Sequence, residues 1–183
     1  QSLLASVTNH LAASVRRANS VALRDYQQQL ANDIEAAWQS GAQNVLAVLP
    51  TGGGKTVVFS HILWGHDGHS CAVAHRQELV SQISMALARC HVRHRIIAPN
   101  PVVRRIVQFH VEELGSSYYD PASKVAVAGV DTLINRADDP SVKQWLSAVT
   151  RWVMDEAHHV LRANKWGKGV ALFPNALGLG VTA

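Results

Sequence analysis

The chain has 183 residues, of which 48% are hydrophobic, and it carries a formal net charge of +4. One domain with a full core fits this length and composition, and the mild basicity permits a polyanionic partner without requiring one. No apolar run approaches the roughly 18 residues that a membrane-spanning helix needs, so no membrane partner is expected. Two cysteines, Cys71 and Cys90, make no disulfide framework, which favours a reducing, cytoplasmic location.

The first half of the chain is expected to alternate between helices and strands. Residues 1–20 carry apolar side chains at near-helical spacing, and we expect either a short amphipathic helix or a tail there. Apolar periodicity and turn residues then predict five further elements. They are a helix over 27–40, a strand over 45–49, a helix over 57–63, a strand over 71–74 and a helix over 77–89.

The second half continues the same alternation. We expect a strand over 95–97, a helix over 102–114 with Pro101 at its first turn, a polar turn region over 115–123, and strands over 125–128, 152–154 and 177–181. Gly167 to Gly169 and Pro174 predict loops. Alternating strands and helices imply an α/β fold in three layers, a parallel sheet with helices on both faces.

A glycine-rich turn follows the strand expected over 45–49 and precedes the helix expected over 57–63. A strand, such a turn and a helix N-terminus together form an anion cradle, in which backbone N–H groups surround a phosphate. Lys55 is expected to reach the β- and γ-phosphates of a nucleotide, and the Thr56 hydroxyl to ligate Mg²⁺. The alternative is a turn that binds nothing. The expected phosphate-binding residues are Thr51, Gly52, Gly53, Gly54, Lys55 and Thr56.

Two adjacent carboxylates, Asp155 and Glu156, follow the strand expected over 152–154. Ligands of a parallel α/β sheet sit at the carboxyl ends of the strands, where the glycine-rich turn is also expected. Asp155 can then hold the Mg²⁺ that bridges the phosphates, and Glu156 can orient or deprotonate the attacking water. The alternative is a solvated helix N-cap, because both residue types are favoured there.

Together these two motifs resemble motifs I and II of superfamily 2 helicases and translocases of the DEAH type. Helicase phosphate-binding loops follow the pattern Pro-Thr-Gly-x-Gly-Lys-Thr, which residues 50–56 satisfy although Leu49 replaces the first glycine of the general pattern. The segment 155–158 reads Asp-Glu-Ala-His, and the resemblance implies that His158 links the nucleotide site to motif III. The ordered resemblance covers roughly residues 21–183, with bacterial and phage repair helicases of the RadD and XPB group as the nearest subgroup.

Further motifs of the same family follow in the expected order. The sequence Leu-Arg-Asp-Tyr-Gln at 23–27 resembles the upstream adenine element, which implies that Arg24 packs on the adenine and Gln27 bonds its edge. Residues 74–82 resemble motif Ia and residues 129–133 resemble motif Ib, both of which contact the nucleic-acid backbone in the family. Arg76 and Thr132 are therefore expected phosphate contacts. Residues 180–183 resemble the start of motif III.

The resemblance implies a RecA-like nucleotide-binding domain that hydrolyses ATP to ADP and phosphate with Mg²⁺. The expected partner is nucleic acid, DNA rather than RNA, bound through its backbone. The family uses a second RecA-like domain to supply an arginine finger, and we expect that domain to be absent from these 183 residues. The isolated chain is then expected to bind ATP weakly and hydrolyse it poorly.

Two other functions fit the nucleotide motifs alone. One is a kinase or metabolic hydrolase with a phosphate-binding loop and no nucleic-acid partner, against which the adenine element and motifs Ia and Ib argue. The other is a binding module that has kept the fold without turnover, against which intact Lys55, Asp155 and Glu156 argue.

Three clusters outside the motifs could also bind ligands. The short spacing of histidines and cysteines over 66–71 and 90–94 permits a zinc site, although solvent-exposed loop histidines are favoured. The arginines at 93, 95, 104 and 105 form a basic cluster for which a solvated face is favoured over a nucleic-acid contact. Residues 165–168, Lys-Trp-Gly-Lys, fit single-strand binding and loop packing equally well.

Overall fold

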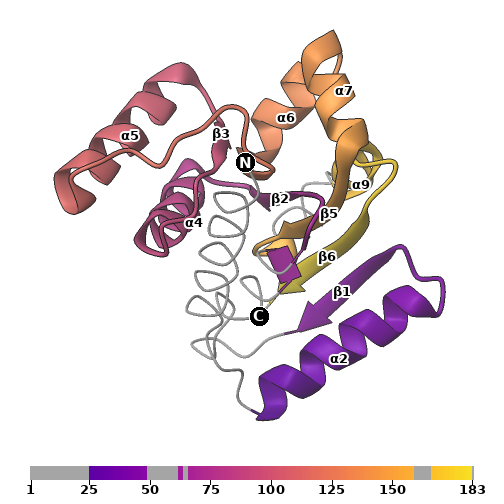
Figure 1. Ribbon diagram of the computed structural model, residues 1–183. Coiled ribbons are helices and arrows are strands. Elements are labelled where there is room, and N and C mark those ends of the chain that lie inside the picture. Colours follow the sequence, from indigo (N-terminus) through magenta and orange to yellow (C-terminus); the bar gives the residue numbers. More distant parts are fainter. Residues whose placement is uncertain (1–24, 49–61, 64–65, 159–165, 183) are drawn as a thin grey trace, which may run out of the picture.

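A parallel sheet of six strands forms the centre of the computed structural model, which describes residues 25–48, 62–63, 66–158 and 166–182 (Figure 1). The strand order is β1-β6-β5-β2-β4-β3, and every paired neighbour runs parallel. The carboxyl ends of all the strands therefore lie at one edge. The strands are β1 (Asn44–Val48), β2 (His69–Ala74), β3 (Arg95–Ile97), β4 (Val125–Gly129), β5 (Val149–Met154) and β6 (Leu177–Thr182).

Helices cover both faces of this sheet. One face packs on α2 (Asp25–Gln39), α4 (Gln77–Arg89) and α5 (Asn100–Leu114), and the other on α6 (Val130–Arg136), α7 (Pro140–Ala148) and α9 (Trp166–Leu172). Strand β2 illustrates the division, because Ala72 and Ala74 face α2 and α4 whereas Cys71 and Val73 face the other layer. The three-layer α/β expectation is thus confirmed.

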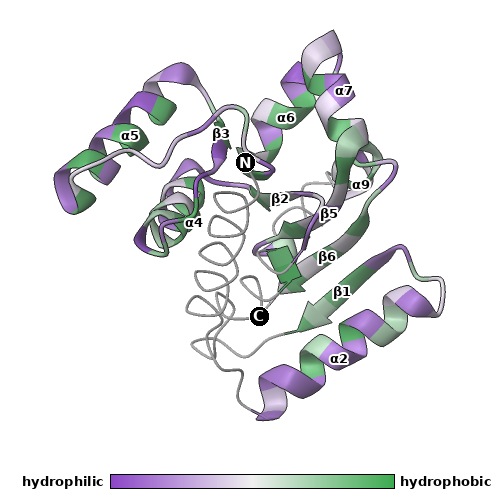
Figure 2. Cartoon of the chain, viewed as in Figure 1, coloured by the Kyte–Doolittle hydropathy of each residue, from purple (hydrophilic) through white to green (hydrophobic). Residues whose placement is uncertain are grey.

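The hydropathy pattern explains this layering. Figure 2 shows the strands largely in hydrophobic colours, whereas α2 carries hydrophilic and hydrophobic residues along its length. A strand covered on both faces can be apolar at every position, as in Cys71 to Ala74, where every residue is buried. Only one face of α2 needs to be apolar, and Ala31, Ile34 and Trp38 supply it.

Strand β6 contains two glycines because aromatic rings lie against it. A Cβ at Gly178 would overlap the ring of Trp152, and a Cβ at Gly180 would lie 2.7 Å from the ring of Trp166. Trp152 is fully buried and stacks on Phe173 with 5.6 Å between ring centroids. The close packing of Trp152 of β5 and Trp166 of α9 against β6 therefore depends on the missing side chains at these two positions.

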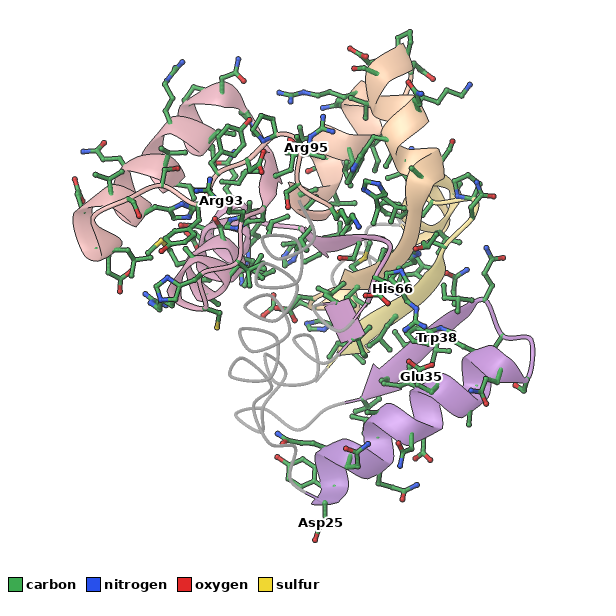
Figure 3. The ribbon with its side chains drawn as sticks, viewed as in Figure 1. Asp25, Glu35, Trp38, His66, Arg93 and Arg95 are labelled. Carbon is green, nitrogen blue, oxygen red and sulfur yellow. The ribbon has the colours of Figure 1, made fainter. Side chains whose placement is uncertain are left out.

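The C-terminal part of helix α2 contacts the sheet through Glu35 and Trp38. The guanidinium of Arg151 lies 4.5 Å from the centroid of the Trp38 ring and 3.0 Å from the Glu35 carboxylate. Figure 3 shows Glu35 and Trp38 on the side of α2 that faces the strands. The Trp38 indole N–H also donates to the Gly178 carbonyl at 3.1 Å. These contacts fix the orientation of α2 and of the chain that leads into β1.

Most of the expected elements are observed. The helix over 77–89 and the strand over 95–97 have the expected bounds, and the other expected strands differ from theirs by one to three residues at either end. The helix expected over 57–63 lies outside the described residues except for Ile62 and Leu63, which are helical, and residues 1–20 also lie outside them. The sequence analysis missed α6, α7 and α9.

The expectation of a loop at Gly167 to Gly169 is wrong, because these residues lie within α9. Pro174 does lie in a turn. The helix is short and contains two glycines, so its packing on the sheet, and not its intrinsic propensity, maintains it. Among the described residues, no helix has both the length and the apolar character needed to cross a bilayer.

Candidate nucleotide-binding site

The strand register brings motif II and motif Ia together. Met154 of β5 pairs with Val73 of β2, so the residues that follow these two strands leave the sheet side by side. The Asp155 N–H donates to the Val73 carbonyl at 3.0 Å, which continues the ladder one residue beyond β5. Asp155 is therefore held at the carboxyl edge of the sheet by backbone hydrogen bonding.

Glu156 occupies a constrained backbone position. Its φ is +49°, in the left-handed region that side-chain-bearing residues rarely adopt. Its N–H donates to Asp155 Oδ1 at 2.8 Å, which stabilises the sharp turn after β5. Such positions typically cost on the order of 1–3 kcal/mol and concentrate at functional sites. The next residue, Ala157, is fully buried, so a small side chain is required there.

The Glu156 carboxylate faces the end of β2. Its Oε2 atom lies 3.3 Å from Nη2 of Arg76 and 3.8 Å from Nδ1 of His75. The Arg76 side chain is 53% exposed and that of Glu156 is 22% exposed, so the pair sits at the rim of the site. Arg76, expected as a phosphate contact, thus has a carboxylate partner that the sequence analysis did not foresee.

His158 connects motif II to the end of β6. Its Nδ1 atom lies 2.9 Å from the hydroxyl of Thr182, the last residue of that strand. Strand β6 lies between β5 and β1. This hydrogen bond therefore links motif II to the strand that neighbours β1, which precedes the glycine-rich turn. The contact joins the two segments that resemble motifs II and III.

Motif Ib lies beside motif Ia. Ala74 and Gly129, the last residues of β2 and β4, are register partners, so the two strands end at the same level. Thr132 is in the first turn of α6 and is half-buried, whereas Arg76 is the exposed N-cap residue of α4. The strand ends from which these two residues follow, Ala74 and Gly129, are about one strand spacing apart, roughly 5 Å. Both expected phosphate contacts therefore lie on one edge of the sheet.

The glycine-rich turn, including Lys55 and Thr56, lies outside the described residues, as does Arg24. The strand before the turn ends at Val48, which pairs with Thr182 of β6. The chain therefore enters the turn at the same edge as motif II. Figure 1 shows α2 running antiparallel to β1, which places its first turn toward this edge. Gln27, in that turn, is 4% exposed.

The histidines and cysteines expected to be exposed or to bind zinc have other roles. The described residues contain no group of three or more potential ligands arranged for a metal ion. The expectation of solvent-exposed histidines is wrong for His94, which is fully buried and lies 2.6 Å from the Ser84 hydroxyl. His66 bonds the Thr150 hydroxyl, and burial raises the pKa of the Cys71 thiol far above its ordinary value.

The other two clusters are also partly packed. Arg95 is half-buried with its guanidinium 5.1 Å from the centroid of the Trp145 ring, so it is not a freely solvated cation, whereas Arg93, Arg104 and Arg105 are exposed. Trp166 packs against Trp152 with 5.6 Å between ring centroids. Residues 165–168 fitted single-strand binding and loop packing equally well, and the Trp166 ring is packed.

Residues 20–183 match the family described as Type III restriction enzyme, res subunit. The chain belongs to this family. Its matching region is the RecA-like domain found at the N-terminal side of superfamily 2 helicases. The matched range contains both the glycine-rich sequence at 51–56 and the paired carboxylates Asp155 and Glu156.

One curated relative and several solved structures resemble this res-subunit domain. The chain is 32% identical over 148 residues to IRC3 of Saccharomyces cerevisiae, a protein whose assignment as an ATP-dependent helicase is provisional. The match covers 75% of this chain and 19% of IRC3, so the chain spans about a fifth of that relative.

The structural relatives share the fold at low identity. A nuclease-deletion mutant of the Type ISP restriction-modification enzyme LlaGI, solved in complex with a DNA substrate mimic, has a TM-score of 0.56 at 14% identity over 89% of this chain and 17% of its own. The UvsW helicase of Bacteriophage T4 has a TM-score of 0.54 at 17% identity, and the match covers 88% of this chain and 52% of UvsW. The Pyrococcus furiosus Hef helicase domain has a TM-score of 0.53 at 20% identity, and the match covers 87% of this chain and 32% of the Hef chain. These likenesses establish a RecA-like fold.

The sequence analysis missed His75 as a neighbour of the site. His75 directly follows β2 and precedes Arg76, and its Nδ1 atom lies 3.8 Å from the Glu156 carboxylate. The available signal was its position, because polar residues immediately after a parallel strand lie at the ligand-binding edge of the sheet.

Proposed function

We propose that this domain is the ATP-binding motor domain of an ATP-dependent helicase or translocase of the DEAH type. It hydrolyses ATP to ADP and phosphate and couples this reaction to the remodelling of nucleic acid. The supporting observation is the position of Asp155 and Glu156 at the end of β5, beside motif Ia at the end of β2 and at the same edge as the end of β1. We also propose the RadD and XPB subgroup, on the motifs of this sequence.

The proposed metal ligands are Asp155 and Thr56. Carboxylate and hydroxyl oxygens are hard ligands of the kind that Mg²⁺ prefers, and the Glu156 N–H helps to orient the Asp155 carboxylate. When bound, Mg²⁺ would neutralise charge on the β- and γ-phosphates. Lys55 would add a fixed positive charge beside the transferring phosphoryl group, while Thr51 to Gly54 would supply backbone donors. Arg24 and Gln27 would hold the adenine.

Glu156 would accept the proton of the attacking water. Its turn, with φ at +49° and an N–H bonded to Asp155, lies at the carboxyl edge of the sheet, beside the proposed nucleotide site. A general base must be held within hydrogen-bond reach of the proton it takes, so this backbone geometry is part of the proposed catalytic role. His158, bonded to Thr182, would transmit changes at this site to motif III.

The proposed partner is a nucleic-acid strand, DNA rather than RNA, lying along the edge that carries Arg76 and Thr132. An arginine and a threonine hydroxyl on neighbouring segments suit contacts to successive phosphates, which position a strand without reading its sequence. A second RecA-like domain of the same protein would bring the arginine finger. The rival function is a nucleotide hydrolase or kinase without a nucleic-acid partner.

Steady-state ATP hydrolysis by the full-length protein, with and without an oligonucleotide, separates these functions. We expect the oligonucleotide to raise the rate, and we expect its binding to weaken steeply with salt because phosphate contacts release counterions. Lys55→Ala should abolish hydrolysis and serves as the control for contaminating activity. A rate that is lost in Lys55→Ala and yet independent of oligonucleotide at every salt concentration would favour the rival.

A further inference from the structure

The Arg76 guanidinium has a carboxylate partner in the proposed catalytic centre. Nη2 of Arg76 donates to Oε2 of Glu156 at 3.3 Å. Arg76 has extended backbone angles, φ −123° and ψ 146°, at the N-cap of α4, and it follows the strand that neighbours β5. The side chain therefore leaves the sheet at the same edge as Glu156.

This contact and the expected phosphate contact compete for one side chain. Arg76 is 53% exposed, so a phosphate of a bound strand can reach it from solvent. Ion pairs with an exposed partner are weak, whereas arginine forms strong charge-assisted and often bidentate hydrogen bonds with phosphate. A bound strand can thus draw the guanidinium away from Glu156.

The contact also bears on the reactivity of Glu156. The oxygen that accepts the arginine hydrogen bond, Oε2, also lies 3.8 Å from His75 Nδ1, so two groups that follow β2 lie beside it. An oxygen held in this way is poorly placed to accept a proton from water at the nucleotide. Once Arg76 leaves, the carboxylate is freer to turn toward that water.

We propose that the Arg76–Glu156 ion pair restrains ATP hydrolysis until a nucleic-acid phosphate takes Arg76. The inference rests on the proposed function and assigns the coupling between its two ligands to one pair of side chains. Arg76 acts here through Glu156 and is a positioning residue. The alternative is that the ion pair only stabilises the fold at the ends of β2 and β5.

Substitution of Arg76 distinguishes these possibilities in the full-length protein. Arg76→Gln should raise the rate of ATP hydrolysis without nucleic acid several-fold and bring the ratio of rates with and without saturating oligonucleotide toward one. Arg76→Lys keeps the charge and should restore part of that ratio. Arg89→Gln is the matched control, because Arg89 is an exposed arginine at the opposite end of α4, 55% exposed, and is ion-paired at 3.0 Å to Glu113. It should behave as the wild type.

The outcomes separate this inference from the proposed function. A wild type stimulated by oligonucleotide, together with an Arg76→Gln variant whose unstimulated rate is unchanged or lower, would overturn the restraint alone. A wild type that hydrolyses ATP at a rate independent of oligonucleotide would overturn both the nucleic-acid partner and the restraint. A raised unstimulated rate in Arg76→Gln, with Arg89→Gln unchanged, is the result we expect.

Discussion

Gly178 shows how a single residue controls the packing of the central strands. The ring of Trp152 lies where a side chain at this position would begin, and Trp152 itself stacks on Phe173. Trp152 is fully buried and cannot swing into solvent. By contrast, a Cβ at Gly167, in α9, would meet no atom within 4 Å. These two glycines form a matched pair for testing the packing of β6.

Gly178→Ala should destabilise the domain by about 1–3 kcal/mol, because an added methyl forces buried side chains from their packed positions. Gly167→Ala should cost nothing and can gain up to roughly 1 kcal/mol, since alanine favours a helix more than glycine does. Chemical denaturation followed by fluorescence measures both changes in the free energy of unfolding. Equal stability of the two variants would show that β6 does not approach Trp152 this closely.

At the residue scale, the sequence suggested candidate site residues but not the contacts that they make. Asp155 and Glu156 could be selected because they follow an apolar strand at the edge of the sheet where the glycine-rich turn is also expected. Arg76 was selected from its motif alone. Its pairing with Glu156 could not be predicted, because the two residues are 80 positions apart and meet only through the pairing of β2 with β5.

At the scale of elements, a buried network joins α4 and α5 to His94, the residue that precedes β3. The Ser84 hydroxyl lies 2.6 Å from His94 Nε2 and 2.9 Å from His110 Nε2. The Tyr118 N–H donates to His110 Nδ1, and His94 Nδ1 faces the Val92 carbonyl at 2.9 Å. These outer partners fix both tautomers, so His110 donates to Ser84 and Ser84 donates to His94. Every nitrogen is satisfied when both histidines are neutral.

Acid should therefore weaken this part of the fold. Burial lowers the pKa of His94 from 6.5 to about 4, and it also lowers the pKa of His110. The unfolded chain binds protons more readily, so stability is fully present above pH 6.5 and is lost as the pH falls toward 4. The shift at His94 corresponds to about 3 kcal/mol.

Denaturation midpoints between pH 7 and 4 test this prediction. His94→Gln should be less stable at neutral pH and should lose less stability on acidification than the wild type. His91→Asn removes an exposed histidine from a left-handed position that asparagine tolerates, and it should keep the wild-type pH dependence. An unchanged pH dependence in His94→Gln would assign the acid sensitivity to other groups.

The length of each helix explains whether the sequence could predict it. Helices α4 and α5 were expected because each has a long apolar stripe, and Gly115 ends α5 with φ at +80°. Helices α6 and α9 have seven residues each and α7 has nine, too short for a periodic pattern to stand out. Their packing on the sheet decides their conformation.

At the scale of the whole molecule, the parallel sheet assembles the proposed site. The carboxyl ends of β1, β2, β4, β5 and β6 come from across the chain and lie at one edge, since all six strands run in the same direction. The α/β class followed from the alternation of elements. The strand order did not, because it depends on how helices pack on the two faces and leaves no periodic signal.

The central claim is that this edge hydrolyses ATP with Glu156 as the base. The most direct measurement compares ATP hydrolysis and ATP affinity in the full-length wild type and in Glu156→Gln. Glu113→Gln, which alters an exposed glutamate paired to Arg89, is the control. Hydrolysis should fall by at least about 100-fold in Glu156→Gln with ATP affinity nearly unchanged. A Glu156→Gln protein that hydrolyses ATP as fast as Glu113→Gln would contradict this account.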